Sequence, residues 1–315
     1  MARYLVAVCA AVAMMLTGCT TVVTGTPVPD PELRVPLTSQ LAFGDLTTID
    51  YCSLLDIESL GDAGVRGIGA TTSTFNYCFA KGSLGERAVE FGLGYLESHA
   101  DQGQRVRDTT RTLKRNLTAQ RSVANDDRSC TMYLLFPDMA SLQVYTDDTG
   151  VTAGGSADEL CEVAGSVLDG MVTVLLAKKV GHLTFPAGSA GTVDACQLLP
   201  QEQVAAYFGQ QPMRTPEIPT RHRCRWLDPL TRDSVNVQFD GGKAPSGGLE
   251  TIAGRPTEVA GVGAGYCRAS TAVGSPAASG DSTLAQVYYF ARAGRDACQA
   301  VRDLATAAWP KLPSS

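Results

Sequence analysis

Hydrophobic residues are spaced differently at the start of the chain and in its body. Residues 4–16 form an uncharged apolar run that follows Arg3 and leads into the sequence Leu-Thr-Gly-Cys, which ends at Cys19. A basic residue, an apolar run and small residues at its end are typical of a secretory signal peptide. The run is shorter than the about 20 apolar residues that a membrane-spanning helix needs. We therefore expect residues 1–18 to be removed as a signal peptide.

The body contains short segments in which apolar and polar residues alternate. Because successive side chains of a β-strand point to opposite faces of its sheet, this pattern predicts strands with one apolar face. Further strands are expected at residues 142–145 and 285–290. The alternating apolar positions are Val89, Phe91, Leu93 and Tyr95, then Cys130, Met132, Leu134 and Phe136, and finally Val235, Val237 and Phe239.

Apolar residues three or four positions apart predict a helix at the end of each half of the body. Such spacing gathers apolar side chains into one stripe, which a helix can bury against a sheet. Shorter helices are expected within residues 54–60 and 198–204. The apolar stripes of the longer helices are Leu160, Val163, Val167, Met171 and Val174 in the first half, and Cys298, Val301, Leu304 and Ala308 in the second.

The cysteine spacing indicates that the body repeats itself. After Cys19, the first four cysteines are separated by 26, 52 and 31 residues, and the second four by 28, 43 and 31. An Asp-x-Cys-x-Leu-Leu motif surrounds Cys52 and again Cys196, and Gln-Val-Tyr recurs at 143–145 and 286–288. This order indicates two tandem copies of one domain. Each is expected to be an α+β domain in which a mostly antiparallel sheet packs with a short N-terminal and a longer C-terminal helix.

An even number of cysteines in an exported chain predicts disulfides rather than metal ligands. Four cysteines allow three connectivities within each copy, and the sequence alone does not choose among them. We favour bonds between neighbours because the 31-residue spacing is the same in both copies, whereas the middle spacing differs. The expected pairs are Cys52–Cys78, Cys130–Cys161, Cys196–Cys224 and Cys267–Cys298.

Composition divides the chain into five segments. The residues that follow Cys19 are rich in Thr, Val and Pro and lack apolar periodicity, which is typical of a semi-extended tether. The residues around Pro186 also lack periodicity and indicate a linker. The expected segments are a signal peptide at 1–18, a lipid-anchored tether at 19–44, the first repeat at 45–180, the linker at 181–193 and the second repeat at 194–315.

The sequence that ends at Cys19 resembles a bacterial lipobox, in which the cysteine thiol receives a diacylglycerol and becomes the mature N-terminus. Two acyl chains on one residue suffice for stable membrane anchoring. The resemblance therefore implies a lipid-anchored protein on the extracytoplasmic face of the cell membrane.

Several motifs of the second repeat strengthen this resemblance. They are Asp-x-Cys-x-Leu-Leu at Cys196, Cys-Arg-Trp at 224–226, Ile-Ala-Gly-Arg-Pro at 252–256, and Tyr266-Cys267. With the lipobox, they resemble actinobacterial, mycobacterial-type lipoproteins of the domain of unknown function 3558 family. The resemblance covers residues 193–312, and the first repeat reads as a diverged copy. It implies an α+β domain with disulfides and carries no established catalytic residues.

The sequence offers few signs of catalytic chemistry. A net charge of −6 argues against a general nucleic-acid partner. No Gly-x-Ser-x-Gly, Walker or His-Glu-x-x-His sequence occurs, so we expect no catalytic residue, metal or cofactor. The histidines His99, His182 and His222 are expected on the surface, and the acidic pairs Asp126-Asp127 and Asp147-Asp148 in solvated loops.

One basic segment is a candidate binding face. Arg107, Arg111, Lys114 and Arg115 would share one face if this stretch is helical. Such a face could dock a phosphorylated envelope glycolipid or an acidic partner. The alternative is an ordinary solvated helix face.

These features favour a membrane-anchored cell-envelope lipoprotein that acts as a non-enzymatic binding or accessory module. Its partners would be the membrane, through lipid on Cys19, and an envelope protein or an amphiphilic cell-wall ligand. Two alternatives stay open: an envelope hydrolase or transferase with an unrecognised site, and a purely structural scaffold. A carboxylate or histidine with a strongly shifted pKa inside a cleft would favour the enzyme.

Overall fold

The computed structural model describes residues 35–98, 110–122, 127–150, 156–208, 213–214, 219–261, 265–274, 282–291 and 296–313. The chain from Pro36 onward forms one compact unit. The predicted signal peptide and Cys19 lie outside the described residues.

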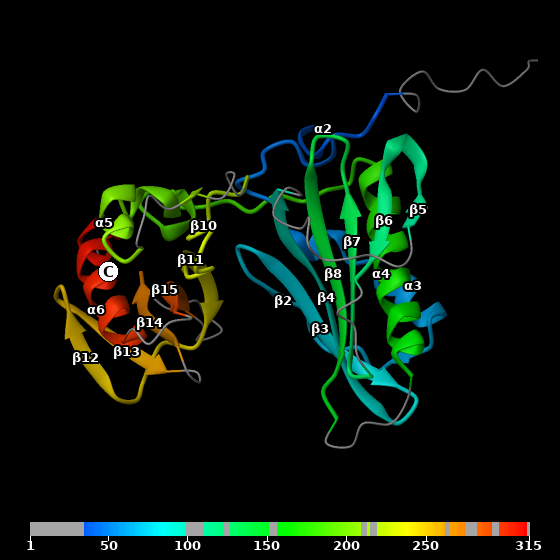
Figure 1. Cartoon of the computed structure of the whole chain (residues 1–315). Coiled ribbons are helices and arrows are strands. Elements are labelled where there is room, and N and C mark those ends of the chain that lie inside the picture. The colour runs from blue at the N-terminus through cyan, green and yellow to red at the C-terminus, as the bar shows by residue number, and fades with distance from the viewer. Residues whose placement is uncertain are drawn as a thin grey trace, which may run out of the picture. The chain divides into compact units, whose positions relative to one another are not determined.

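The first repeat contains a mostly antiparallel sheet and the helices that pack with it. Its helices are α2 (Ser39–Phe43), η2 (Tyr51–Leu54), α3 (Ile57–Asp62), η4 (Lys114–Asn116) and α4 (Ala157–Leu176). Its strands are β1 (Val65–Arg66), β2 (Thr72–Ser73), β3 (Tyr77–Leu84), β4 (Arg87–Ser98), β5 (Thr110–Thr112), β6 (Thr118–Arg121), β7 (Ser129–Leu135) and β8 (Ala140–Asp148). The strand order is β1-β3-β4-β8-β7-β6-β5, with β2 paired to β3 (Figure 1).

The second repeat has the same parts. Its helices are η5 (Ala190–Thr192), η6 (Ala195–Gln197), α5 (Gln201–Ala205), α6 (Ala297–Ala308) and η7 (Trp309–Lys311). Its strands are β9 (Met213–Arg214), β10 (Arg223–Leu227), β11 (Ser234–Gly242), β12 (Leu249–Ile252), β13 (Arg255–Gly261), β14 (Tyr266–Val273) and β15 (Ser282–Phe290). The strand order is β12-β13-β14-β15-β11-β10-β9 (Figure 1).

The two sheets share one topology. In the first, β3-β4-β8-β7 form the centre and the hairpin β6-β5 continues one edge; in the second, β10-β11-β15-β14 and the hairpin β13-β12 take the same places. A closing helix follows the last strand in both repeats. The predicted α+β fold of two tandem copies is therefore confirmed.

The disulfides occupy equivalent places and join the neighbours that the spacing favoured. Cys52–Cys78 and Cys196–Cys224 each tie a short 3-10 helix to the first central strand. Cys130–Cys161 and Cys267–Cys298 each tie the strand next to the hairpin to the closing helix.

The Asp-x-Cys motif has a structural role in both repeats. The carboxylate of Asp50 accepts a hydrogen bond from the backbone N–H of Cys52 at 3.0 Å, and Asp194 does the same for Cys196 at 2.8 Å. Each aspartate caps the 3-10 helix that carries the cysteine, which satisfies a backbone donor at the start of that helix.

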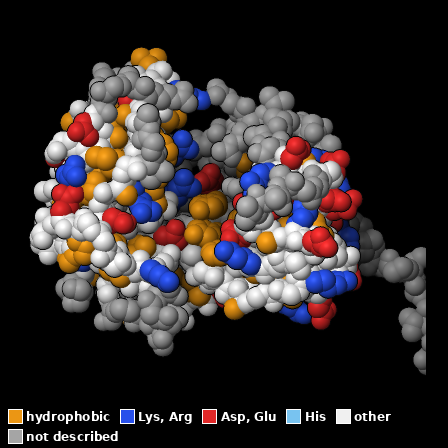
Figure 2. All heavy atoms as spheres, turned by 90° about the horizontal axis from the view of Figure 1, so that it is seen from below, with side chains coloured by type: hydrophobic (Ala, Val, Ile, Leu, Met, Phe, Trp, Pro, Cys, Tyr) orange, Lys and Arg blue, Asp and Glu red, His pale blue; other side chains and the backbone are white. Residues whose placement is uncertain are grey.

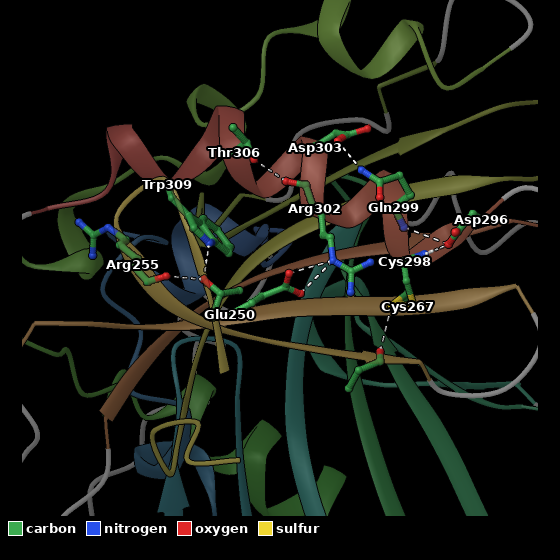
Figure 3. Close-up of polar contacts among 12 residues, drawn as sticks. Glu250, Arg255, Cys267, Asp296, Cys298, Gln299, Arg302, Asp303, Thr306 and Trp309 are labelled. Atoms are coloured by element: carbon green, nitrogen blue, oxygen red, sulfur yellow. Dashed lines mark hydrogen bonds and ion pairs between the residues drawn. A yellow bond between two sulfur atoms is a disulfide. The ribbon is translucent and has the colours of Figure 1, made fainter. Parts of the chain in front are cut away.

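The closing helices bury their predicted apolar stripes against one face of each sheet. Leu160, Val163, Val167 and Met171 of α4 are fully buried, and so are Val301 and Ala308 of α6. Figure 3 shows how polar groups fasten α6 and its extension to the second sheet: Arg302 Nε donates to both carboxylate oxygens of Glu250, and Trp309 Nε1 donates to Thr257 Oγ1 at 3.0 Å. One face of each sheet is thus covered by a helix.

The segment that was expected to be a tether contributes to the first core. Leu37 and Phe43 are 2% and 1% exposed, and the Leu37 N–H donates to the carbonyl of Arg115. Thr38 caps α2. The described end of the expected tether, residues 37–43, therefore packs with the first repeat because its apolar side chains find partners there.

Candidate ligand-binding faces

Among the described residues, no helix covers the second face of the central strands in either repeat. Alternation along β8 turns Leu142 and Val144 toward α4 and Tyr145 away from it, and alternation along β15 turns Val287 toward α6 and Tyr288 away from it. Because these uncovered faces carry aromatic and polar side chains, they are the candidate sites. Figure 2 shows hydrophobic side chains gathered with acidic and basic ones along the hollowed part of the surface.

The uncovered face of the first repeat contains a hollow of about 370 Å³, which we call the acidic hollow. Its described lining carries two carboxylates and no Lys or Arg. The lining residues are Tyr77, Phe79, Glu90, Tyr95, Ser129, Thr131, Gln143, Tyr145 and Asp147.

The uncovered face of the second repeat contains a hollow of about 390 Å³, which we call the arginine hollow. Its described lining carries three arginines and no carboxylate. The lining residues are Arg223, Arg225, Arg232, Ser234, Asn236, Gly265, Tyr266, Phe290 and Ala291.

Strand register shows that the two hollows are one site built twice. Counted from the equivalent cysteines Cys78 and Cys224, the pairing of Phe79 with Gly92 matches that of Arg225 with Asn236. The next strand continues the match, because Gly92 pairs with Tyr145 and Asn236 pairs with Tyr288. The equivalent positions are Tyr77 and Arg223, Phe79 and Arg225, Glu90 and Ser234, Gly92 and Asn236, Ser129 and Tyr266, and Asp147 and Phe290.

The Gln-Val-Tyr motif is what the two uncovered faces share. Gln143 and Tyr145 in the first repeat answer Gln286 and Tyr288 in the second. In the second repeat, the Tyr288 hydroxyl donates to Gln286 Oε1. The sequence showed this motif only as a mark of the repeat. Combined with strand register, it would have pointed to both uncovered faces, although only the first copy, with Gln143 and Tyr145, lines a hollow.

A β-bulge brings Tyr95 into the acidic hollow. The pairing of β4 with β8 shifts register between Gly94 and Glu97, and Tyr95 has a positive φ of 51°. Leu96, not Tyr95, is buried in the core, and the Tyr95 ring stacks on Tyr77 with centroids 5.2 Å apart. The prediction that Tyr95 continues the apolar face of Val89, Phe91 and Leu93 is therefore wrong. Burial raises the pKa of Tyr95 to about 12, so it stays a neutral donor at physiological pH.

The two uncovered faces meet through a small set of polar contacts. Arg223 forms an ion pair with Glu97, and its guanidinium carbon lies 5.5 Å from the centroid of the Tyr95 ring. Nearby, the Asn76 amide donates to the carbonyl of Phe239 at 2.7 Å. Arg223 therefore belongs to the arginine hollow and also contacts the first repeat.

Asp240, on the uncovered side of β11, has a strongly shifted pKa. It is 9% exposed, and burial raises the pKa of its carboxyl from 3.8 to about 6, although hydrogen bonds from Gly241 and Thr74 and the charge of Arg223 oppose the shift. No local pattern pointed to this residue, because the shift of its pKa depends on burial against the first repeat.

His222 is buried, contrary to the prediction of a surface position. It is 3% exposed, its Nε2 lies 3.1 Å from the carbonyl oxygen of Gly191, and its ring packs at 4.9 Å from Phe75. Burial lowers its pKa. The contacts come from Phe75 and from Phe185 in the predicted linker, so the local sequence could not show them. It lines a third hollow of about 280 Å³ with Thr48, Asp194 and Arg221, among others.

The other two histidines do not alter this picture. His182 is exposed, as predicted, and its Nδ1 lies 2.8 Å from Thr48 Oγ1. His99 lies outside the described residues.

The predicted basic helix face does not form. Arg111 lies in strand β5, and Lys114 and Arg115 lie in the tight turn that follows, where Arg115 has a positive φ of 56°. Arg111 forms an ion pair with Asp169 of α4. Arg107 lies outside the described residues. The stretch pairs as a hairpin with β6, so its basic residues do not share a helical face.

The acidic pair at the end of β8 is not a solvated loop. Asp148 is 6% exposed and accepts a hydrogen bond from Arg87 Nε at 3.2 Å. A backbone hydrogen bond from Gly150 and the Arg87 guanidinium lower the pKa of Asp148. The long-range partner Arg87 on β4 explains why the local pattern was misleading. In the other pair, Asp126 lies outside the described residues.

The described ranges contain neither a metal-binding cluster nor a membrane-spanning helix. No group of three or more His, Cys, Asp or Glu side chains in these ranges could hold a metal ion. Of the helices that the structure describes, none has both the length and the apolar character needed to span a membrane.

Comparisons with known proteins add little. No protein-family model and no curated protein matches the chain. Two solved structures show weak similarity, each over 82% of this chain and 89% of the other: the di-domain ARO/CYC StfQ from the steffimycin biosynthetic pathway, 9% identical with a TM-score of 0.16, and DynU16 from the dynemicin biosynthetic locus, 11% identical with a TM-score of 0.15. These TM-scores are too low to support an argument about fold or function.

Proposed function

We propose that this chain is a membrane-anchored cell-envelope lipoprotein whose body is a non-enzymatic binding module for an envelope protein or an amphiphilic cell-wall ligand. Two features of the sequence support this localisation. They are the lipobox-like sequence at Cys19 and the resemblance of the second repeat to lipoproteins of the domain of unknown function 3558 family. Four disulfides agree with an oxidising compartment.

The duplicated uncovered face is the observation that carries the binding role. Both repeats place a hollow over the same four strands, lined by aromatic rings and a few polar groups. Concave surfaces of this composition are typical of ligand sites. The side chains around the shared Gln-Val-Tyr motif differ in charge between the repeats, so each hollow suits a different ligand chemistry.

Mass spectrometry of the protein from native membranes tests the proposed lipid anchor and membrane localisation. A diacylated or triacylated Cys19 as the first residue supports the anchor, whereas an unmodified N-terminus rejects it. The same digest, made without reductant, also reports the four disulfides.

Site-directed photo-crosslinking in intact cells tests the binding role. A benzophenone amino acid at Phe290, which is 40% exposed in the arginine hollow, should give a discrete adduct. The matched control is Leu249 on β12, which is 45% exposed but lies outside the hollow. Equal labelling from both positions, or none from Phe290, would argue against a binding face.

An envelope enzyme is the second candidate, and Asp240 favours it. A buried carboxyl with a pKa of about 6 could act as a general acid or base near neutral pH. Turnover of an envelope substrate that is lost in Asp240→Asn, while thermal stability is kept, would establish this candidate over the binding module.

A further inference from the structure

The arginine hollow combines three features that together select a ligand. The first is charge: Arg223, Arg225 and Arg232 line it and its described lining contains no carboxylate, although the chain as a whole has a net charge of −6. Glu97 of the first repeat, which pairs with Arg223, offsets one of these three charges. Guanidinium groups bind carboxylates and phosphates through paired, charge-assisted hydrogen bonds. The hollow is therefore suited to an acidic group.

The second feature is a buried amide. Asn236 is 6% exposed and lines the hollow, and its side-chain oxygen has no hydrogen-bond partner among the described residues. Leaving a buried acceptor without a donor is unfavourable, so a ligand that supplies a hydroxyl or N–H donor gains affinity by filling this position. The equivalent residue in the first repeat is Gly92, which carries no side-chain polar group.

The third feature is an aromatic wall. Phe290 is 40% exposed, and its ring stacks on Tyr266 with centroids 4.3 Å apart. An exposed flat ring beside arginines favours a ligand with a flat apolar face next to its charge. In the acidic hollow, Asp147 and Ser129 hold these two positions.

We propose that the arginine hollow binds an acidic sugar, that is, a hexose ring bearing a carboxylate or a phosphate. The arginines hold the acid, the Asn236 oxygen accepts from a sugar hydroxyl, and the C–H face of the ring packs on Phe290. This inference rests on the proposed binding function and names its ligand class. In the acidic hollow, Glu90 and Asp147 take the positions of Ser234 and Phe290, and their negative charge disfavours the same ligand.

Calorimetric titration of the full-length protein in detergent tests the inference, with glucuronate and glucose 1-phosphate as the acidic probes and glucose as the neutral one. The test variants are Arg225→Gln and Arg232→Gln; the second changes an exposed residue, so it keeps the test valid if the first fails to fold. Lys81→Gln on β3 is the matched control, because it removes the same charge from a position outside both hollows.

At least one acidic hexose should bind while glucose gives no heat, and the arginine variants that fold should lose about tenfold or more in affinity. Lys81→Gln should keep its affinity within about twofold. Equal binding of glucose, no binding of either acid, or unchanged affinity in a folded arginine variant would overturn the inference.

One further arm separates this inference from the proposed function. Excess of the acidic hexose that binds should suppress the crosslink formed from Phe290. A crosslink that persists unchanged would support the proposed binding function and reject an acidic sugar as the ligand.

Discussion

Phe290 in the second repeat occupies the position that Asp147 occupies in the first. Each residue follows the tyrosine of a Gln-Val-Tyr motif by two positions, and each is paired across the sheet with the first residue of the neighbouring strand, Tyr266 or Ser129. One duplicated backbone site thus carries an aromatic ring in one copy and a carboxylate in the other.

This relationship predicts the effect of exchanging the two side chains. Phe290→Asp should weaken glucuronate binding by about tenfold or more, because it places a negative charge in the arginine hollow and removes the wall. Phe290→Leu keeps an apolar side chain and should have the smaller effect, as titration calorimetry would show. A larger loss for Leu than for Asp would contradict the charge argument.

Asp240 predicts a defined pH dependence of stability. Its pKa of about 6 in the folded protein lies above the unfolded value of 3.8, so the folded state binds the proton more tightly. Its contribution is fully present below about pH 4 and is lost as the pH rises through about 6, with a total of about 3 kcal/mol. Urea unfolding from pH 3.5 to 7.5 should show this fall in the wild type. In Asp240→Asn this fall in the free energy of unfolding should vanish. The same pH dependence in both proteins would refute its attribution to Asp240.

The contact between Arg223 and Glu97 should show measurable coupling. The two side chains are 19% and 22% exposed, so solvent screens their ion pair only in part. A double-mutant cycle with Arg223→Gln and Glu97→Gln should give a coupling free energy of about 0.5–1 kcal/mol in urea unfolding. Zero coupling at low salt would mean that this ion pair does not stabilise the contact between the repeats.

Alanine substitution at two glycines should distinguish the cost of backbone strain from that of steric overlap. Gly254 and Gly265 have similar positive φ values of 81° and 79°, but a Cβ at Gly254 meets nothing within 4 Å, whereas one at Gly265 would overlap the carbonyl oxygen of Ala291. Gly254→Ala should cost about 1 kcal/mol of unfolding free energy. Gly265→Ala should cost clearly more, because the Ala291 backbone must move. Equal losses in chemical denaturation would contradict this difference.

The two strand-to-helix disulfides should stabilise their repeats to the same extent. Cys130–Cys161 and Cys267–Cys298 both close loops of 31 residues. Chain entropy predicts a loss of about 3–4 kcal/mol on replacing either pair by alanines. Denaturation of the two double variants would measure this, and a large inequality would show that residual structure in one unfolded repeat alters the balance.

Much of the fold follows from local pattern. The tandem repeat, the neighbour disulfides, the strand around Val235 and Val237 and the stripes of the closing helices were all predicted, because each depends on spacing along the chain.

The parts that were not predicted depend on partners distant in sequence. His222 is buried by Phe75 and Phe185, Asp148 by Arg87, and the basic segment pairs as a hairpin rather than forming a helix. Neither hollow could be located before strand register was known, since its lining residues come from four strands and, in the arginine hollow, also from the adjoining loops. The Gln-Val-Tyr motif was the only local trace of both.

The bulge at Gly94 and Tyr95 also limits how the acidic hollow can change during evolution. Because Tyr95 reaches the uncovered face through an extra residue in β4, any substitution at this position keeps its side chain on that face. Deleting Tyr95 would restore simple alternation, with Gly94 on the uncovered face and Leu96 in the core. The ligand preference of the first repeat can therefore drift by point mutation, whereas the loss of this aromatic position from the face requires a deletion.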